Sequence, residues 1–488
     1  MSSAELFQLY RPEDIVFVIN PSLWYQSMYP TGILCLSSYL EVQGVPSLIV
    51  DSGLHPQKIP LGERERAIIE RLQELKPKVV CFSCTHMEFD EVVRINSAIK
   101  AFYGQVFTIV GGSQPTYRTS DFLDNGFDFV CIGEGEKTLH SFVEQVLKGD
   151  EQWQTIEGLA WKQNGNPVVN PPRQLMAEAE LNFDLISSYK KIDPRYFDFG
   201  VEIIRGLPMV GALLLTTRGC PFSCSFCGCN SIFGRKLRFR PIESIKKEVS
   251  YLTEEKGVEG IWILDDTFTV NRNHATAVAK ILADYNVIWG CQSRVDSLTN
   301  GFVAEMKSYG CIQMDFGVES GSQRILDEVI GKKIKVGQVI HSFELAKKHR
   351  IRTLANFIIG FPTETLADLA ATRSLADQIR ADIYVFSIAI PLPGTRLYEM
   401  VGEEIHPKDY SALNWNGSLL TGKLNKSEIK DVVRERQKLK LRYLIWSILK
   451  SIFSLSGIFF IVSRKHRLKR TWATFRFLLR NLLGLEFL

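Results

Sequence analysis

The chain has 488 residues, of which 58 are Lys or Arg and 54 are Asp or Glu, and its net charge is +4. This length predicts about three domains, and so small a charge excludes the strongly basic surface typical of nucleic-acid-binding proteins. Ten cysteines are few for this length. The first residues do not read as a signal peptide, so we expect a reducing compartment and no disulfide framework.

Residues 1–150 alternate short apolar runs with helix-spaced apolar patterns. The apolar runs lie at 14–20, 48–50, 79–83, 107–110 and 127–132. Strands that alternate with helices predict an α/β domain with a parallel, doubly wound sheet of the Rossmann-like type. In such sheets, ligands bind beyond the carboxyl ends of the strands.

The segments that follow these runs form a candidate binding edge. Glycine at these positions lets a backbone approach a large flat ligand closely. Taken together, the segments favour a binding cleft over ordinary strand-to-helix turns. The candidate contacts are Gly32, Ser83, Gly111, Gly112, Glu134 and Gly135.

Residues 151–205 form a predicted connector. Two short β-type runs, 159–161 and 167–169, flank Gln163–Asn164–Gly165–Asn166. An Asn-Gly pair between such runs is a strong hairpin signal. Pro171–Pro172 then breaks the pattern, as expected between domains.

Three cysteines with C-x3-C-x2-C spacing, Cys220, Cys224 and Cys227, follow an apolar run at 212–217. Three thiolates on one loop suit an iron–sulfur cluster. A fourth thiolate would complete the ligand set of a [4Fe–4S] cluster, whereas three leave one iron open to a substrate or cofactor. A structural zinc site is the weaker alternative, because it would show two cysteine pairs or cysteine and histidine pairs.

Six other cysteines lie in mostly apolar surroundings. We expect them to be buried, inert thiols. Cys81 and Cys84 form a C-x2-C pair without a second pair, which is a weak candidate for another metal site. The six are Cys35, Cys81, Cys84, Cys131, Cys291 and Cys311.

Residues 206–400 contain six β-type runs separated by helical stretches. The runs are 212–217, 261–264, 287–289, 313–318, 353–359 and 384–389. This repeat predicts a partial (β/α)6 barrel of the TIM type, with its chemistry at the carboxyl ends of the strands. Carboxylates at such ends are costly unless they bind something, although a helix cap or a rim salt bridge explains any single one. The polar residues at these ends are Asp265, Asp266, Ser293, Arg294, Glu319 and Ser320.

Residues 401–488 are predicted to be a helical region that is both basic and apolar. The stretch 444–462 is strongly apolar apart from Lys450, and a basic run follows at 463–470. Its length reaches the transmembrane range, but the central lysine weakens that interpretation. Three alternatives stay open for 444–488: helices that cap the barrel, an interfacial anchor on anionic lipid, and a true membrane span.

The cysteine loop, the acidic pair after the second barrel run and the run Phe316–Ser320 resemble the radical S-adenosylmethionine (SAM) enzymes. The first domain, with Pro30-x-Gly32, Val110–Gly112 and Gly133–Glu136, is similar to the cobalamin-binding domain of one subgroup. The resemblance therefore covers about residues 1–400. It points to radical SAM enzymes that contain a cobalamin-binding domain, such as the class B methyltransferases.

This resemblance implies roles for individual residues. The three cysteines would ligate a [4Fe–4S] cluster, and SAM would chelate its open iron. Phe226 would lie against the adenine or simply pack under the loop. One of the two aspartates would meet the methionine ammonium, although this chain lacks the usual Gly-Gly-Glu run there. The implied SAM contacts are Phe226, Asp265, Asp266, Arg294, Glu319 and Ser320.

The same resemblance assigns the glycine-lined edge of the first domain to cobalamin. The chain lacks the D-x-H-x-x-G motif whose histidine coordinates cobalt, since Asp51 and His55 have no following glycine. His86 is a weaker alternative ligand. The subgroup commonly binds cobalamin without a protein histidine on cobalt, and an open lower face favours methyl transfer.

The leading functional hypothesis is cobalamin-dependent methylation of an unactivated carbon in a small-molecule or lipid substrate, after cleavage of SAM to a 5′-deoxyadenosyl radical. A cobalamin-associated cyclase or rearrangement enzyme is the main alternative, and a non-catalytic iron–sulfur sensor is a weaker one. We expect an electron donor such as flavodoxin or ferredoxin and no nucleic acid. The expected location is the cytoplasm, with contact between the C-terminal region and the inner membrane face as an alternative. No residue of the chain is assigned as catalytic itself.

Overall fold

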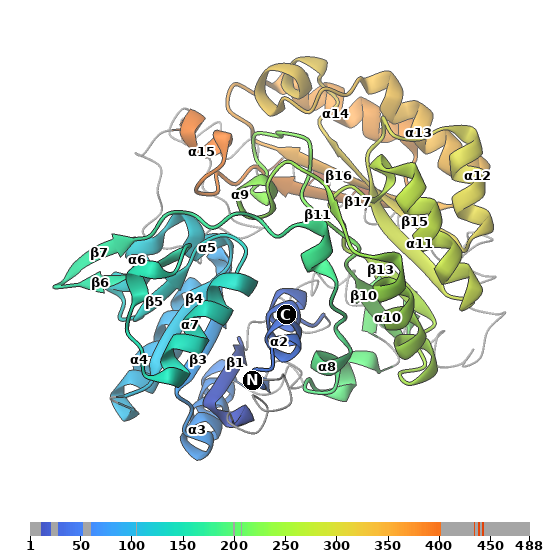
Figure 1. Ribbon diagram of the computed structural model, residues 1–488. Helices are drawn as coiled ribbons and strands as arrows, with labels where there is room; N and C mark the ends of the chain where they lie inside the picture. The colour runs from blue at the N-terminus through green and yellow to red at the C-terminus, as the bar shows by residue number, and fades with distance from the viewer. Residues whose placement is uncertain are drawn as a thin grey trace.

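The protein is described by a computed structural model that covers two sheets, each with its own helices, lying side by side (Figure 1). The described residues are 11–20, 28–51, 60–103, 105–198, 201–205, 207–401, 434, 438, 439, 442 and 443. The α/β class, with a Rossmann-like first part and a barrel-like second part, is confirmed.

The first sheet has seven strands in the order β2-β1-β3-β4-β5-β6-β7. The first five are parallel, as predicted, and β6 and β7 pair antiparallel at one edge. The strand order reverses between β1 and β3, which is where doubly wound sheets bind ligands. The strands are β1 (Ile15–Ile19), β2 (Leu48–Asp51), β3 (Val79–Ser83), β4 (Phe107–Gly111), β5 (Phe129–Cys131), β6 (Leu159–Gln163) and β7 (Asn166–Val169).

The sequence suggests that the β6–β7 hairpin belongs to a connector between domains, whereas in the structure it is part of the first sheet. Its turn forms as predicted, because Asn164 and Gly165 have positive φ angles of 52° and 80°, which a two-residue hairpin turn requires. However, β6 also pairs with β5 and so extends the first sheet. The side chains of residues 159–161 are buried, and a neighbouring strand is needed to bury them. The hairpin signal is local and does not say which sheet edge the hairpin joins.

Helices cover both faces of the first sheet. Val16 and Val18 lie in one apolar cluster with Ile68 and Ile95, whereas Phe17 lies in the cluster on the opposite face. Strands buried on both faces read as continuous apolar runs, which is why the sequence locates them. The helices are α2 (Thr31–Val42), α3 (Leu61–Leu75), α4 (Phe89–Phe102), α5 (Ser113–Tyr117), α6 (Thr119–Asp124) and α7 (Glu136–Lys148).

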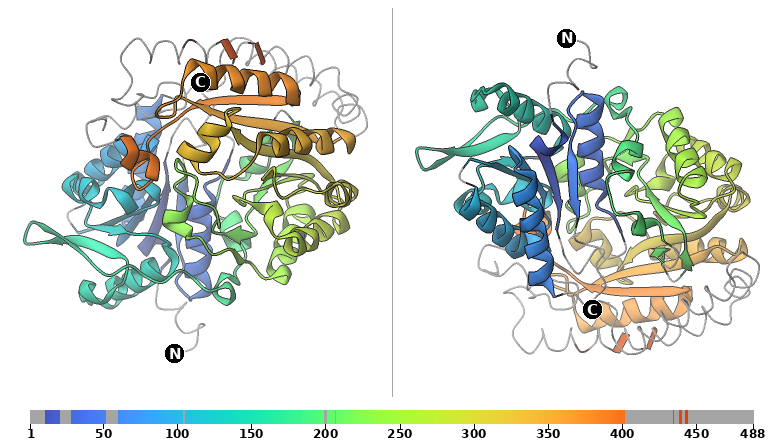
Figure 2. Two further views of the ribbon diagram at one scale, coloured as in Figure 1. Left: turned by 90° about the horizontal axis from the view of Figure 1, so that it is seen from above. Right: turned by 90° about the horizontal axis from the view of Figure 1, so that it is seen from below.

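The second sheet has six parallel strands in the order β10-β13-β14-β15-β16-β17. This order follows the sequence, as predicted for a partial (β/α)6 barrel. Its strands are β10 (Gly211–Leu214), β13 (Gly260–Ile263), β14 (Ile288–Ser293), β15 (Cys311–Glu319), β16 (Arg352–Ile359) and β17 (Ile383–Ile388). Helices lie outside the curve of this sheet (Figure 2). They are α10 (Ile242–Glu254), α11 (Arg272–Asp284), α12 (Asn300–Ser308), α13 (Val336–Lys348) and α14 (Leu366–Ile379).

Tyr29, from the first part of the chain, joins the two halves at β10. Its hydroxyl accepts a hydrogen bond from the Leu213 N–H (2.7 Å) and donates to the Leu213 carbonyl (3.0 Å). An edge strand presents unpaired backbone groups, and this buried hydroxyl satisfies two of them. A short hairpin of β8 (Val201–Ile204) and β9 (Leu207–Met209) also packs against β10 and β13.

A few described residues of the C-terminal region pack beside β17, the opposite edge strand of the barrel. Tyr443 stacks on Tyr384 with ring centroids 4.3 Å apart and bonds through its hydroxyl to Asp377 of α14 (2.6 Å). Arg442 forms an ion pair with the same carboxylate (2.9 Å). The three alternatives for 444–488 concern residues outside the described part. No described helix is both long and apolar enough to cross a membrane.

Candidate active site

The cysteine loop leaves the carboxyl end of β10 and is closed at its base by a two-stranded ribbon. The ribbon strands are β11 (Thr217–Arg218) and β12 (Arg238–Phe239), which pair antiparallel. Cys220, Cys224 and Cys227 are partly exposed on this loop. The six cysteines predicted to be buried are buried, so the sequence separates the two kinds correctly.

The three loop cysteines supply the thiolates that an iron–sulfur cluster needs, and the loop contains no histidine. In the described part of the chain, no three His, Cys, Asp or Glu side chains are gathered as they would be around a single metal ion. Burial raises the pKa of Cys227 to about 11, so its thiolate needs a bound cation to stabilise it. These features fit an iron–sulfur cluster.

Arg294 and two backbone hydrogen bonds hold the loop in place. The Arg294 guanidinium lies 3.5 Å from the ring centre of Phe222 and binds Asp296 through two nitrogens (2.9 and 2.8 Å). The Ser225 N–H donates to Ile330 (2.8 Å), and its carbonyl accepts from Leu397 at the start of α15 (Arg396–Val401) (2.8 Å). Arg294 therefore supports the loop through Phe222, and its contact with the SAM carboxylate stays a prediction.

The two aspartates after β13 have different environments. Asp265 is fully buried, and its carboxylate accepts hydrogen bonds from the Thr216 N–H (2.6 Å), the Thr217 N–H (3.0 Å) and the Thr216 hydroxyl. Burial raises its pKa to about 6. Its oxygens therefore bind the segment between β10 and β11, and a contact with SAM stays a prediction. Asp266 is exposed and accepts a bond from the Cys229 thiol (2.9 Å), so it is the aspartate that faces the loop.

Glu319 ends β15 in a left-handed conformation with φ of 64° and is buried. The Lys332 ammonium lies 2.6 Å from its carboxylate and 2.6 Å from the Gly317 carbonyl. Lys332 follows a short π-helix, Ile325–Ile330, and nothing in its sequence context predicts this position. Ser320, by contrast, accepts a bond from the Ser322 N–H (3.1 Å) and contacts Thr372 (3.3 Å). Its hydroxyl therefore stabilises this turn, and a contact with SAM stays a prediction.

Phe226 lies against the segment that follows β16. Its ring centre is 6.1 Å from that of Phe361, which is fully buried in the run Gly360–Phe361–Pro362. The described residues thus pack Phe226 under the cysteine loop, and an adenine contact stays a prediction.

The predicted cobalamin edge has a close backbone approach at Gly112. Its φ is +108°, and a Cβ there would lie 2.7 Å from the Cys84 carbonyl oxygen. Gly133 also has positive φ (78°), and its N–H donates to the Thr116 hydroxyl (3.1 Å). A Cβ on Gly135 would lie 3.0 Å from the Leu36 side chain. These glycines bring three loops close together at the carboxyl edge of the sheet.

The other predicted contacts on this edge are less constrained. Gly32 lies in the first turn of α2, where an added Cβ meets nothing within 4 Å. The Ser83 carbonyl at the end of β3 accepts a bond from Asn20 (2.7 Å). His86 lies in a 3-10 turn just after β3, and His55 falls outside the described residues.

Several buried polar atoms near this edge have no hydrogen-bond partner among the described residues. Such atoms are costly to bury alone, and a polar ligand rich in amide groups, such as cobalamin, would satisfy them. This donor set therefore fits the predicted cofactor. The atoms are Asn20 Oδ1, Thr31 Oγ1, Gln114 Nε2 and the Tyr117 hydroxyl.

The Glu134 carboxylate binds the base of the cysteine loop, and its contact with cobalamin stays a prediction. Its buried carboxylate binds Arg238 (2.8 Å), Arg218 (3.3 Å) and the Met176 N–H (2.8 Å). Both arginines belong to the ribbon at the base of the cysteine loop. Nearby, α5 packs against α9 (Cys229–Phe233), which lies within that loop. The carboxyl edge of the first sheet and the cysteine loop at the carboxyl edge of the second sheet are therefore next to each other.

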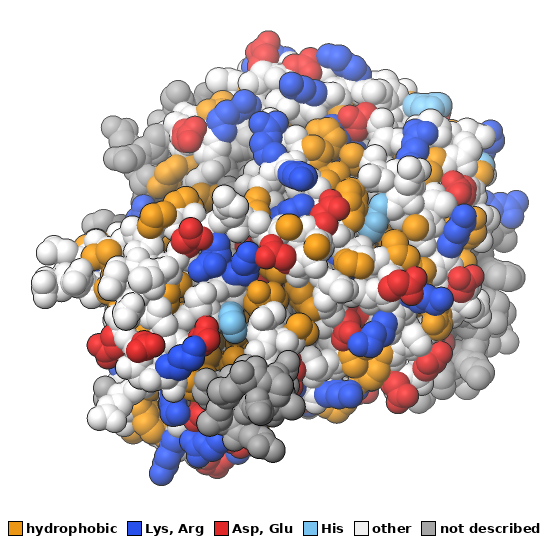
Figure 3. Space-filling model, in the orientation of Figure 1, with side chains coloured by type: hydrophobic (Ala, Val, Ile, Leu, Met, Phe, Trp, Pro, Cys, Tyr) orange, Lys and Arg blue, Asp and Glu red, His pale blue; other side chains and the backbone are white. Residues whose placement is uncertain are grey.

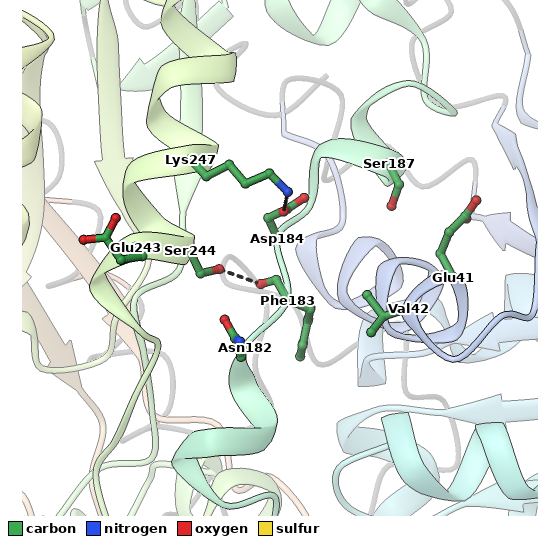
Figure 4. A pocket seen from close by; sticks show the side chains of 9 residues that line it. All are labelled: Glu41, Val42, Asn182, Phe183, Asp184, Ser187, Glu243, Ser244 and Lys247. Carbon is green, nitrogen blue, oxygen red and sulfur yellow. Dashed lines mark hydrogen bonds and ion pairs between the residues drawn. The ribbon is translucent and has the colours of Figure 1, made fainter. Parts of the chain in front are cut away.

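A surface pocket lies elsewhere in the molecule and contains none of the candidate residues. It is formed by the end of α2, the segment 182–187 and the start of α10. Within it, Lys247 binds Asp184 and the Ser244 hydroxyl donates to the Phe183 carbonyl (Figure 4). Charged side chains of both signs are scattered over the face shown in Figure 3.

Comparisons with known proteins agree with this division of the chain. Residues 214–376 match the radical SAM superfamily and residues 24–143 match the B12 binding domain. An uncharacterized methyltransferase of Pyrococcus horikoshii is 33% identical over 341 residues, which are 68% of this chain and 71% of that protein. Hopanoid C-3 methylase of Methylococcus capsulatus is 23% identical over 474 residues, which are 94% of this chain and 86% of that protein.

A solved structure shares the fold. The radical SAM methyltransferase TsrM of Kitasatospora setae, with cobalamin and a [4Fe–4S] cluster bound, has a TM-score of 0.67 at 17% identity. The match covers 80% of this chain and 75% of that chain. The similarity is long enough to include both the first sheet and the partial barrel, and at this identity it concerns the fold alone.

Proposed function

The chain belongs to the radical SAM enzymes that carry a cobalamin-binding domain, and we propose that it methylates an unactivated carbon of its substrate. The observation that carries this proposal is the contact between the cysteine loop and the glycine-lined edge of the first sheet. An enzyme that only cleaves SAM needs the cysteine loop but not the glycine-lined edge. Transfer of a methyl group from cobalamin requires that the loop and the edge open onto one shared space.

The cofactors of this family are a [4Fe–4S] cluster, SAM and cobalamin. When bound, they supply a 5′-deoxyadenosyl radical that abstracts hydrogen and a methyl group that replaces it. The protein supplies position. Cys220, Cys224 and Cys227 would hold the cluster, and the Asp266 carboxylate would accept hydrogen bonds from the methionine ammonium of SAM. Arg294 and Asp265 act indirectly. Arg294 holds the cysteine loop through Phe222, and Asp265 holds the backbone of the segment that leads into the loop.

Glu319 and Lys332 lie beside this loop and are proposed to contact the ribose and methionine portion of SAM. Their ammonium–carboxylate pair is buried, with side chains 8% and 6% exposed. A buried pair keeps its geometry because separating it leaves an unpaired charge. SAM therefore meets groups that are already oriented. The glycine edge of the first sheet, with its unpartnered polar atoms, is proposed to hold cobalamin.

A lipid or other apolar molecule is the proposed substrate class. The match to hopanoid C-3 methylase spans 94% of the chain and so extends into the basic and apolar C-terminal region. The run 463–470 beside an apolar stretch is suited to anionic membrane surfaces. This supports peripheral contact with the inner face of the membrane. The electron donor is proposed to be a protein such as flavodoxin or ferredoxin.

The test is anaerobic reconstitution of the full chain with iron, sulfide and cobalamin, followed by incubation with a strong reductant and SAM labelled in its methyl group. We expect 5′-deoxyadenosine from the wild type and none from Cys224→Ala. With a lipid extract of the source organism present, the label should enter a lipid fraction. Label in a water-soluble product would overturn the substrate class alone. Formation of 5′-deoxyadenosine without labelled product would favour a cyclase or rearrangement enzyme.

A further inference from the structure

Two carboxylates of the first sheet and two arginines of the cysteine loop form a buried cluster, here called the clamp. Its members are Glu134, Glu136, Arg218 and Arg238. Arg238 binds Glu134 at 2.8 Å, Arg218 binds Glu134 at 3.3 Å, and Arg218 also binds Glu136. Each of the four side chains is at most 5% exposed. Burial alone would raise the pKa of Glu136, but Arg218 outweighs it and holds that pKa below its usual range.

On one side, the clamp fixes both ends of the cysteine loop. Arg218 lies two residues before Cys220, and Arg238 pairs with Arg218 across the ribbon where the chain returns. Arg238 also donates to the Phe233 carbonyl at the end of α9 (2.7 Å). One carboxylate, Glu134, therefore contacts the strand that enters the loop and the strand that leaves it.

On the other side, the clamp belongs to the turn that lines the predicted cobalamin edge. Gly133 immediately precedes Glu134, and its N–H donates to the Thr116 hydroxyl (3.1 Å). That hydroxyl donates in turn to the Gly112 carbonyl (2.7 Å). The backbone that would meet cobalamin and the carboxylates that hold the cysteine loop are thus one or two residues apart in the same turn.

We infer that the clamp is a positioning device that sets the cysteine loop in a fixed orientation to the bound cobalamin. Guanidinium–carboxylate pairs prescribe orientation as well as contact, and apolar residues of the same volume would hold the interface without doing so. Both carboxylates bind arginines of the cysteine loop, and Glu134 also binds the Met176 N–H, so we place them as positioning residues. This inference rests on the proposed function, because it assumes that both cofactors bind.

The test uses Glu134→Gln in the reconstituted full chain. The amide keeps the shape and one acceptor but removes the charge that orders both arginines. The measured quantity is the electron spin relaxation of the reduced cluster with and without paramagnetic cob(II)alamin, because relaxation enhancement depends steeply on the distance and orientation of the two spins. Iron content, cobalamin affinity and thermal stability are measured on the same samples.

We expect the wild type to show one defined enhancement, and Glu134→Gln to keep iron and cobalamin but lose the enhancement or show several. The matched control is Glu41→Gln, which removes the carboxylate that pairs with Lys191 between α2 and the segment after α8 (Ile186–Tyr189). The control should behave as the wild type. Should Glu134→Gln fail to fold, Arg238→Lys is the second variant, with the same expected loss.

Three outcomes would overturn the inference. One is an enhancement in Glu134→Gln equal to that of the wild type, even with a lower melting temperature, since the clamp would then serve stability alone. Another is an equal loss in Glu41→Gln. The third is wild-type protein that takes up iron but no cobalamin, and this result alone would also overturn the proposed function.

Discussion

The carboxyl edges of the two sheets are built in opposite ways. On the second sheet, charged side chains already bind one another: Arg294 binds Asp296, and Lys332 binds Glu319. On the first sheet, the edge consists of glycine backbone and of buried polar atoms, such as Gln114 Nε2, that lack a partner among the described residues. In the proposed arrangement, the SAM side is organised before its ligand binds, whereas the cobalamin side would obtain its hydrogen bonds from the ligand.

Gly112→Ala should have the largest effect. It should weaken ligand binding at the carboxyl edge of the first sheet and leave the second sheet unaffected. A positive φ costs an alanine about 1–2 kcal/mol, and forcing a Cβ to 2.7 Å from the Cys84 oxygen adds overpacking of about 1–3 kcal/mol. The loop will relax to avoid this contact, so cobalamin must restore the strained form. We expect a loss on the order of a hundredfold in cobalamin affinity, measured by absorbance titration, with iron content unchanged.

The control for this substitution is Gly62→Ala in α3, where an added Cβ meets nothing within 4 Å. Alanine is the better helix former by about 1 kcal/mol, so this variant should be slightly more stable and bind cobalamin normally. Normal cobalamin binding by Gly112→Ala would show that cobalamin does not bind at the carboxyl edge of the first sheet.

Asp265→Ala and Asp266→Ala should separate support from ligand contact on the second edge. Removing Asp265 leaves two buried backbone N–H groups unpaired, at about 1–3 kcal/mol each, so the unfolding free energy should fall by about 3 kcal/mol. Removing the exposed Asp266 should change stability by less than about 0.5 kcal/mol and weaken SAM binding instead. Both variants are measured by urea denaturation and by SAM titration. If Asp265→Ala weakened SAM binding and Asp266→Ala lowered stability, the two aspartates would have the opposite roles.

Glu91→Gln should have the smallest effect on cofactor binding, and it concerns a buried acid in α4. Burial raises the pKa of Glu91 to about 8, and its Oε1 has no partner among the described residues. As pH rises from the ordinary glutamate pKa towards 8, the unfolded chain loses this proton while the folded chain keeps it. Stability from this group is therefore complete in acid and declines up to about pH 8.

The glutamine variant should remove this decline, with a gain of no more than about 5 kcal/mol above pH 8, at about 1.36 kcal/mol for each unit of pKa. Melting temperatures of both proteins at pH 5, 7 and 8.5 provide the measurement. Parallel pH profiles for the two proteins would show that Glu91 does not titrate in this range.

Local patterns in the sequence determined most of the architecture. Continuous apolar runs located the parallel strands of both sheets, because strands buried on both faces need apolar residues at every position. The C-x3-C-x2-C spacing located the cysteine loop, since ligands on one short loop reveal themselves by their separation. The Asn164–Gly165 pair located a hairpin, because few residues other than asparagine and glycine tolerate positive φ.

Only the tertiary structure decided which charged residues meet. Glu134 looked like a cofactor contact, yet it binds Arg238, which lies 104 positions further along the chain. Neighbouring Asp265 and Asp266 looked equivalent, and Lys332 gave no signal at all. The physical reason is that an apolar side chain needs only a buried place, which periodicity reveals, whereas a buried charge needs one particular partner at hydrogen-bond distance. That partner usually lies on another element, and the packing of the elements brings it there.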